Sequence, residues 1–169
     1  HLLAGLADAG AQVLVVSLTT DADRAGRRRL APGFDEETVA ISPRQSEAEH
    51  RMRLVSTTHA ITDIAASLLW SATPEFAASI RAELADAAVA VLVQPYLASA
   101  LAALAPRHLP VVLDAQNHEA TMKASLLGGT RGGRWLAREA ADAERLALDL
   151  AAAVVTTTAQ DAALFRRVD

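Results

Sequence analysis

The stretch Pro110-Val111-Val112-Leu113-Asp114-Ala115-Gln116-Asn117-His118-Glu119 decides how this chain folds. A short apolar run follows the proline, ends in an acid and opens into polar residues, which predicts a buried strand over 111–113 with a polar exit. In open α/β sheets, ligands bind outside the carboxyl ends of the strands. We therefore expect chemistry at Asp114–Glu119.

Similar apolar runs on either side of this stretch predict further strands. Buried strands are expected at 12–18, 88–93 and 152–157, and a short strand towards an edge at 36–42. Helical spacing occupies the intervals, as two helices or one broken helix at 45–70 and then at 73–84, 97–105, 118–127, 134–150 and 158–169. This alternation predicts an α/β fold of the Rossmann-like doubly wound type, a mostly parallel sheet with helices on both faces.

The first residues predict a helix over 1–9, ended by Gly10, and then the strand at 12–18. A helix followed by such a strand is half of a βαβ unit, so a strand is expected before the helix. We therefore expect the first strand of the sheet to be missing from residues 1–169, with a vacancy beside 12–18. The polar segment 19–33, with Arg27-Arg28-Arg29, is interpreted as a loop that is either solvated or contacts an anion.

Composition excludes several classes of protein. Hydrophobic residues make up 51% of the chain and aromatic residues 4%, so the core is expected to consist of Ala, Leu and Val. The net charge of -4 argues against general nucleic-acid binding, and the absence of cysteine excludes disulfides and thiolate sites. The length suits one domain, 1–169, and no apolar run or basic leader indicates a membrane span or a secretory signal.

Common cofactor motifs are missing from the sequence. It has no GxGxxG after a strand, no Walker lysine loop, no HExxH and no GxSxG. The glycine-rich segment 128–133 follows a helix, so we interpret it as a mobile connection rather than a phosphate cradle. The five histidines, His1, His50, His59, His108 and His118, show no metal-ligand spacing, and no metal site is predicted.

Two roles are open for the polar exit of the central strand. Asp114, His118 and Glu119 could form a general acid-base set, since a carboxylate near an imidazole fixes its tautomer and raises its pKa. Alternatively, Asp114 and Asn117 cap the following helix, and Glu119 complements its dipole. The two roles can coexist.

Four segments together resemble the N-terminal domain of a GT-B glycosyltransferase of the family-four-like group. They are LLAGLADAGAQVLVVSL (2–18), AVLVQPYLASAL (90–101), VVLDAQNHE (111–119) and a long helix whose Glu144 stands before AAAVVTTTAQDAALF (151–165). The resemblance spans almost all of the chain. Many members carry a histidine at the position that matches Gln116, and here His118 follows two residues later.

The resemblance implies the acceptor-binding half of an enzyme that transfers a sugar from a nucleotide-sugar to an acceptor hydroxyl. The nucleotide-sugar is a co-substrate held mainly by a separate C-terminal Rossmann-like domain, so no further cofactor is implied and residues 1–169 alone are expected to be inactive. The acceptor is a sugar or a lipid-linked molecule, and the expected location is cytoplasmic, with peripheral contact to the inner face of the plasma membrane left open. The candidate catalytic residues are His118 and Glu119, and the candidate substrate-binding residues are Gln94, Tyr96, Gln116, Asn117 and Thr157. The alternative is a non-catalytic Rossmann-like module that binds a ligand or partner through the same strand ends.

Overall fold

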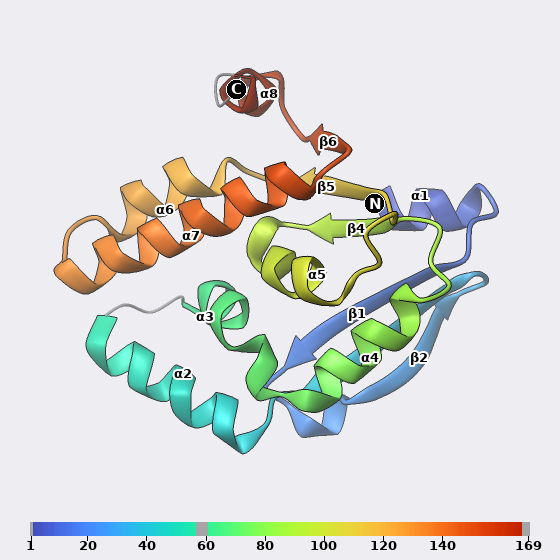
Figure 1. Cartoon of the computed structure of the whole chain (residues 1–169), viewed down its shortest axis with the longest axis horizontal. Helices are drawn as coiled ribbons and strands as arrows, with labels where there is room; N and C mark the ends of the chain where they lie inside the picture. The colour runs from blue at the N-terminus through green and yellow to red at the C-terminus, as the bar shows by residue number, and fades with distance from the viewer. Residues whose placement is uncertain (1, 57–60, 167–169) are drawn as a thin grey trace.

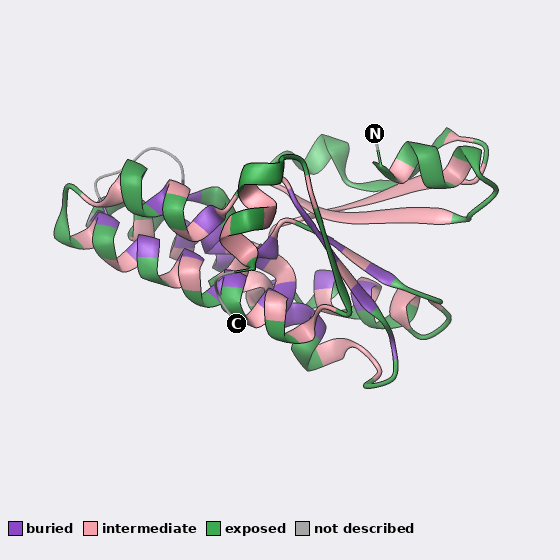
Figure 2. Cartoon of the chain, turned by 90° about the horizontal axis from the view of Figure 1, so that it is seen from above, coloured by how far each residue is buried: buried purple, intermediate pink, exposed green. Residues whose placement is uncertain are grey.

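A computed structural model describes residues 2–56 and 61–166 of the chain (Figure 1). Helices separate most of the strands along these residues, with β2 and β3 consecutive, and the strands form two three-stranded sheets, β1-β3-β2 and β4-β5-β6. The long helices lie on one side of the strands and α1 lies on the other (Figure 2). The expected α/β fold, Rossmann-like and with helices on both faces, is therefore confirmed.

The first sheet consists of β1 (Val13–Thr19), β2 (Gly26–Ala31) and β3 (Phe34–Ala40). β3 lies in the middle, parallel to β1 and antiparallel to β2. Two expectations are therefore wrong, because 19–33 contains a strand and the strand at 36–42 is central. The charges explain the difference: on β2, the side chain of Arg28 pairs with Glu36 and that of Arg29 pairs with Asp35 at 3.0 Å. These cross-strand ion pairs let a run of arginines form a strand.

The second sheet is fully parallel and consists of β4 (Ala90–Val93), β5 (Val111–Ala115) and β6 (Ala153–Thr156). The opening stretch forms its central strand, β5. This strand runs two residues further than predicted, because Asp114 pairs with Val93 of β4 and Ala115 with Thr156 of β6. Asp114 is consequently a buried strand residue and not the start of the polar exit.

The expected vacancy in the sheet is confirmed. Within the described residues, no pairing joins β1 to β4, and the strands fall into two sheets at this position. β1 was expected to be buried on both faces, yet all seven of its residues are only half-buried. β6 was also expected to be buried and is mostly exposed. Both strands lie at a sheet edge, where a neighbour covers only one side.

The helices follow the predicted intervals closely. Helices α2 and α3 both fall largely within the segment at 45–70, and residues 57–60 between them lie outside the described part. Gly10 ends the first helix with φ 95, as a glycine after a helix end allows. The helices are α1 (Leu2–Asp8), α2 (Pro43–Ser56), α3 (Thr62–Leu69), α4 (Pro74–Leu84), α5 (Ala98–Leu104), α6 (Glu119–Leu127), α7 (Arg131–Leu150) and α8 (Ala159–Phe165), with 3-10 turns η1 (Ala22–Arg24), η2 (Trp70–Ala72) and η3 (Pro95–Leu97).

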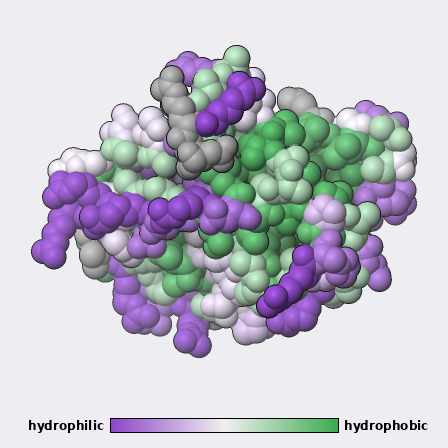
Figure 3. All heavy atoms as spheres, turned by 45° about the horizontal axis from the view of Figure 1, so that its top comes forward, coloured by the Kyte–Doolittle hydropathy of each residue, from purple (hydrophilic) through white to green (hydrophobic). Residues whose placement is uncertain are grey.

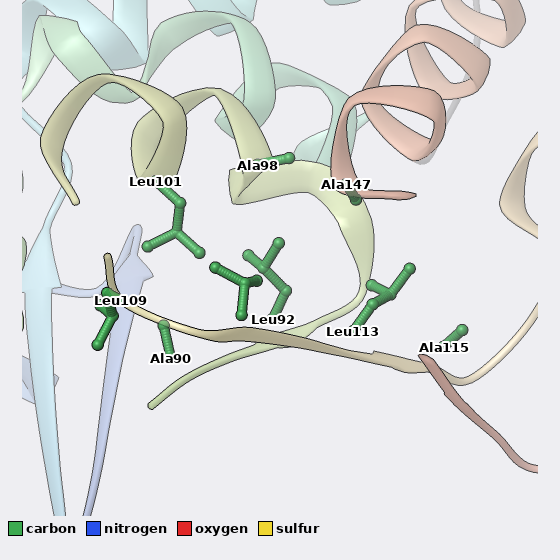
Figure 4. Packing of buried hydrophobic residues seen from close by; sticks show 9 residues of the cluster. Ala90, Leu92, Ala98, Leu101, Leu109, Leu113, Ala115 and Ala147 are labelled. Carbon is green, nitrogen blue, oxygen red and sulfur yellow. The ribbon is translucent and has the colours of Figure 1, made fainter. Parts of the chain in front are cut away.

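The main core lies between the second sheet and helices α5 and α7 (Figure 4). Alternate residues of β4 and β5, including Leu92 and Leu113, point towards Leu101 of α5 and Ala147 of α7. Small side chains on α7 let this helix pack closely on the sheet, as the composition predicted. On α7, the buried residues Leu136, Ala140, Ala143 and Ala147 follow one another at intervals of three and four residues, which places them on one face of the helix.

The glycine-rich segment before α7 is more ordered than predicted. Thr130 is the N-cap of α7, and its hydroxyl oxygen accepts a hydrogen bond from the Gly133 N–H at 2.9 Å. Gly133 therefore lies in the first turn of the helix and not in a mobile connection. A Cβ at this position would lie 1.9 Å from the carbonyl oxygen of Leu127, so the end of α6 meets the start of α7 where only glycine fits.

We expect Gly133→Ala to lower the free energy of unfolding by about 1–3 kcal/mol, the usual cost of overpacking, because backbone must move to admit the methyl group. Gly129→Ala is the matched control, since a Cβ at Gly129 meets nothing within 4 Å. Urea unfolding of both variants measures the difference. Equal stability of the two would contradict the close approach.

Candidate functional site

The carboxyl ends of β4, β5 and β6 bring three polar segments together. The Gln94 N–H after β4 donates to the carbonyl oxygen of Asp114 at 3.2 Å, and the Thr157 hydroxyl after β6 donates to the carbonyl oxygen of Gln116 at 3.0 Å. Asn117 and Thr157 are exposed. The structure thus places the predicted residues Gln94, Gln116, Asn117, His118 and Thr157 at one edge of the second sheet, which we call the rim.

His118 is fixed at the rim by contacts to three helices. It is the N-cap of α6, where its Nδ1 accepts a hydrogen bond from the Thr121 N–H at 3.3 Å. Its ring stacks on Phe165 of α8, with the ring centroids 4.9 Å apart. The Oε2 of Glu144 on α7 lies 3.4 Å from the same Nδ1, and 13% of the His118 side chain remains exposed.

Glu144 entered the sequence analysis only as part of the family resemblance, and its place at the site was not predicted. Its carboxylate accepts the N–H of Glu119 at 2.6 Å and that of Ala120 at 3.3 Å, so it caps α6 from the neighbouring helix. The prediction that Asp114 and Asn117 provide this cap is wrong, because Asp114 belongs to β5 and the capping groups are His118 and Glu144. Its position directly after Ala143 and three residues before Ala147 was a further signal in the sequence, because an acid there interrupts the small apolar residues of the helix.

Tyr96 and Glu119 lie beneath the rim. The Tyr96 hydroxyl donates to the Glu119 carboxylate, and these residues are 5% and 2% exposed. Burial, together with the nearby Glu119 carboxylate, raises the pKa of Tyr96 far above its ordinary value, so the hydroxyl stays protonated. The Nζ of Lys123 lies 5.5 Å from the centre of the Tyr96 ring. Tyr96 and Glu119 therefore support the rim from inside, and the Asp114, His118 and Glu119 set gives way to His118 with Glu144.

The tautomer of His118 determines what this pair can do chemically. When Nδ1 carries its proton towards Glu144, the lone pair of Nε2 is free to accept a proton from a bound hydroxyl. When Nδ1 accepts the Thr121 N–H, Nε2 carries the proton and donates a hydrogen bond instead. Both arrangements suit the recognition of a hydroxyl group.

Gln94 holds an unusual backbone conformation at the rim. Its φ of 73 and ψ of 161 fall in a region that glycine adopts and other residues rarely do. Among the described non-glycine residues it alone has a positive φ. Such strain costs about 1–3 kcal/mol and clusters at sites where a side chain must be held in place.

We expect Gln94→Gly to raise the free energy of unfolding by about 1 kcal/mol, because glycine relieves the strain but is more flexible in the unfolded chain. Gln94→Ala is the matched control, since it removes the amide and keeps the strained Cβ. If the amide contacts a ligand, both variants weaken binding and only the glycine variant gains stability. Urea unfolding checks the stability of each, and an unchanged or lower value for Gln94→Gly would contradict the assignment of strain.

Burial raises the pKa of the Glu144 carboxyl above its ordinary value, and the carboxylate of Glu119 adds to the effect, outweighing His118 and the two N–H donors. The folded protein therefore binds more protons than the unfolded chain between pH 4.5 and the raised pKa. The proton on Glu144 therefore favours the folded state. We expect this stabilisation to be fully present below pH 4.5 and to be lost as the pH rises through that window. Glu144→Gln cannot ionise and should lack this loss. Urea unfolding of both proteins between about pH 4 and 8 tests it, and a difference that grows in favour of the wild type with pH would contradict it.

The described residues contain neither a metal site nor a helix suited to a membrane span. No group of three or more His, Asp or Glu side chains in residues 2–56 and 61–166 could hold a metal ion. Over the same residues, no helix has both the length and the apolar character that a membrane span requires. His1 and His59 lie outside the described part.

Comparison with known proteins yields one family. The family model described as "Glycosyl transferase 4-like domain" matches residues 1–169, which is the whole chain. Searches of curated proteins and of solved structures give no significant match.

Proposed function

We propose, from the premise that this chain belongs to the glycosyl transferase 4-like domain family, that it is the acceptor-side domain of a GT-B enzyme. The enzyme transfers a sugar from a nucleotide-sugar to a hydroxyl group of an acceptor. The observation that carries this proposal is the pairing of His118 with the buried carboxylate of Glu144 at the carboxyl end of a parallel sheet. Open α/β sheets bind their ligands at this end.

The accessible groups at the rim suit a polyhydroxylated ligand. The amides of Gln94, Gln116 and Asn117 each offer both donors and an acceptor, and the Thr157 hydroxyl offers one of each kind. These are the groups that hydrogen-bond sugar hydroxyls without requiring a charge on the ligand. The substrate-binding set is therefore Gln94, Gln116, Asn117 and Thr157, with Tyr96 supporting Glu119 from below.

His118 acts on the acceptor hydroxyl, the group that receives the sugar. Its Nε2 binds the acceptor O–H and takes the proton as the acceptor oxygen bonds to the anomeric carbon of the donor sugar. The bond between that carbon and the phosphate oxygen breaks, and the nucleotide leaves with its electron pair. Glu144 positions the ring and stabilises the imidazolium that forms, while Glu119 is too buried to contact the acceptor.

The proposal also specifies a second domain, the class of acceptor and the location of the enzyme. A second Rossmann-like domain holds most of the nucleotide-sugar, and residues 1–169 alone bind the acceptor without turnover. The acceptor is a sugar or a lipid-linked sugar presented at the inner face of the plasma membrane, and the enzyme is cytoplasmic. No step requires a metal ion or another cofactor.

The decisive experiment incubates the full-length protein with a panel of nucleotide-sugars and measures release of the nucleotide, with and without sugar acceptors. Release that depends on one donor and increases with an acceptor supports the proposal. Binding of a small ligand at the rim without any release would instead favour a non-catalytic Rossmann-like module. That result would remove the enzymatic assignment.

A further inference from the structure

Asp114 is a buried acid that the proposed mechanism does not use. It belongs to the central strand β5, does not cap α6 and is only 7% exposed. Its carbonyl oxygen accepts the Gln94 N–H at 3.2 Å, but among the described residues no hydrogen bond or ion pair reaches its carboxyl group. Asp114 therefore combines a buried position with an unpaired polar group.

An acid at this position does not favour the fold. Aspartate is depleted in strands, and the adjacent Leu113 and Ala115 are buried and apolar. Taking a carboxyl group out of water costs free energy unless another hydrogen-bonding partner replaces the water. Buried polar groups of native proteins nearly always have such a partner, so an unpaired one indicates a position at which a ligand binds.

The side chain of Asp114 faces away from the main core. Leu113 and Ala115 belong to that core, and successive side chains of a strand point to opposite faces of the sheet (Figure 4). On the opposite face, Asp114 lies in register between Val93 of β4 and Val155 of β6, which are 50% and 41% exposed. Neither oxygen of the carboxyl group is fully buried. A ligand on this face can therefore reach it.

The surroundings of this carboxyl group are apolar. Apolar side chains gather on the surface over β4, β5 and α1 (Figure 3). A divalent cation takes several oxygen ligands, and no group of three or more His, Asp or Glu in the described residues could hold one. The position therefore suits a ligand that offers hydrogen-bond donors beside apolar atoms, rather than a metal ion.

A sugar ring offers both kinds of group. Two adjacent hydroxyls can donate to the two oxygens of one carboxylate, and the C–H groups of the ring can lie against Val93 and Val155. Gln94 directly follows Val93, and Thr157 comes two residues after Val155. A ring held by Asp114 therefore lies beside the rim.

We propose that Asp114 accepts hydrogen bonds from two adjacent hydroxyls of a neutral acceptor sugar, whose ring lies against Val93 and Val155. The choice of a sugar rests on the proposed function, whereas the unpaired carboxyl group does not. Asp114 selects the acceptor without taking part in the proton transfer at His118. An acceptor that lacks either hydroxyl leaves one oxygen of Asp114 unpaired and binds more weakly.

NMR titration of the full-length protein with methyl α-glucoside, methyl α-mannoside and methyl α-galactoside tests the proposal. At least one of these probes should bind the wild type. Asp114→Asn should bind it about 10- to 100-fold more weakly, the loss expected for hydrogen bonds to a charged group. Asp149→Asn is the matched control and should bind like the wild type, since Asp149 is exposed in the last turn of α7, at the opposite end of the sheet.

Deoxy analogues of the probe that binds show whether Asp114 contacts a pair of hydroxyls. Loss of one hydroxyl of the pair should weaken binding to the wild type by about 10-fold and leave the affinity of Asp114→Asn nearly unchanged. Equal affinity of the wild type and Asp114→Asn for every probe would overturn the proposal. Failure of every probe to bind the wild type would overturn it as well.

The stability of the full-length protein without a ligand gives an independent readout. Asp114→Val should raise the Tm by about 2–4 °C, because valine suits a buried strand and the unpaired carboxyl group is removed. A lower Tm would show that another part of the protein pairs with Asp114, and this result would contradict a binding role.

Nucleotide release distinguishes this proposal from the proposed function. Sugar binding that depends on Asp114, without turnover of any nucleotide-sugar, would leave the binding site in place and remove the enzymatic assignment. Turnover with an acceptor KM that Asp114→Asn leaves unchanged would remove the role of Asp114 alone.

Discussion

Replacing His118 with alanine in the full-length enzyme should lower kcat/KM by about 100- to 10,000-fold, the range that a positioned acid-base group contributes. In the proposed mechanism the imidazole takes the proton of the acceptor hydroxyl, and the Glu144 carboxylate 3.4 Å from its Nδ1 orients it. Initial rates of nucleotide release at several acceptor concentrations measure the effect. A higher KM for the acceptor with an unchanged kcat would mean that His118 binds the acceptor without transferring its proton.

His108→Ala is the matched control for this substitution. His108 is exposed and precedes β5, so it lies at the opposite end of the sheet from the rim. Its replacement should leave the rate unchanged. His118→Asn separates the two functions of the residue further, because an asparagine can still cap α6 but has no comparable basicity. Full activity of His118→Asn would assign the ring a capping role only.

Replacing Glu144 with alanine should lower the free energy of unfolding by about 2–4 kcal/mol, because two main-chain donors lose their partner. The N–H groups of Glu119 and Ala120 lie in the first turn of α6, where no carbonyl of the helix can accept them. Glu144 is 4% exposed, so solvent compensates little of the loss. Urea unfolding measures the change.

Glu139→Ala on the same helix is the matched control. Glu139 stands five residues earlier, roughly 140° around the helix, and is only half-buried. Its replacement should change the stability by less than about 0.5 kcal/mol, as for most substitutions away from such networks. A similar loss in both variants would show that helix α7 tolerates no change in charge and that the cap on α6 contributes little.

The alternation of strands and helices was predictable because local patterns determine it. Apolar runs such as QVLVVSL and VVLDA read as strands on their own, and Gly10 marks a helix end by its conformational freedom. The strand β2 escaped prediction because a run of arginines has no apolar pattern, and the acids of β3 that pair with these arginines lie in a separate segment of the sequence. The burial of β1 and β6 was overestimated for a related reason, since apolar sequence cannot show which neighbours are present.

The site was predicted in part. Strand ends are visible in the sequence, so the segment around His118 could be singled out, as could Gln94 and Thr157. Which carboxylate meets the imidazole depends on how α6 and α7 pack, and Glu144 is 25 residues away from Glu119 along the chain. The backbone conformation of Gln94 also has no signature in the sequence, since glutamine seldom adopts a positive φ.

The stacking of His118 on Phe165 links the imidazole to the position of α8. A ligand that fixes the orientation of the ring gains affinity when Phe165 is in place, and by thermodynamic reciprocity it holds α8 against α6 to the same extent. Any segment attached to α8 that pulls this helix away would therefore weaken ligand binding at the rim by an equal free energy. The ring pair thus couples occupancy at the rim to the position of α8.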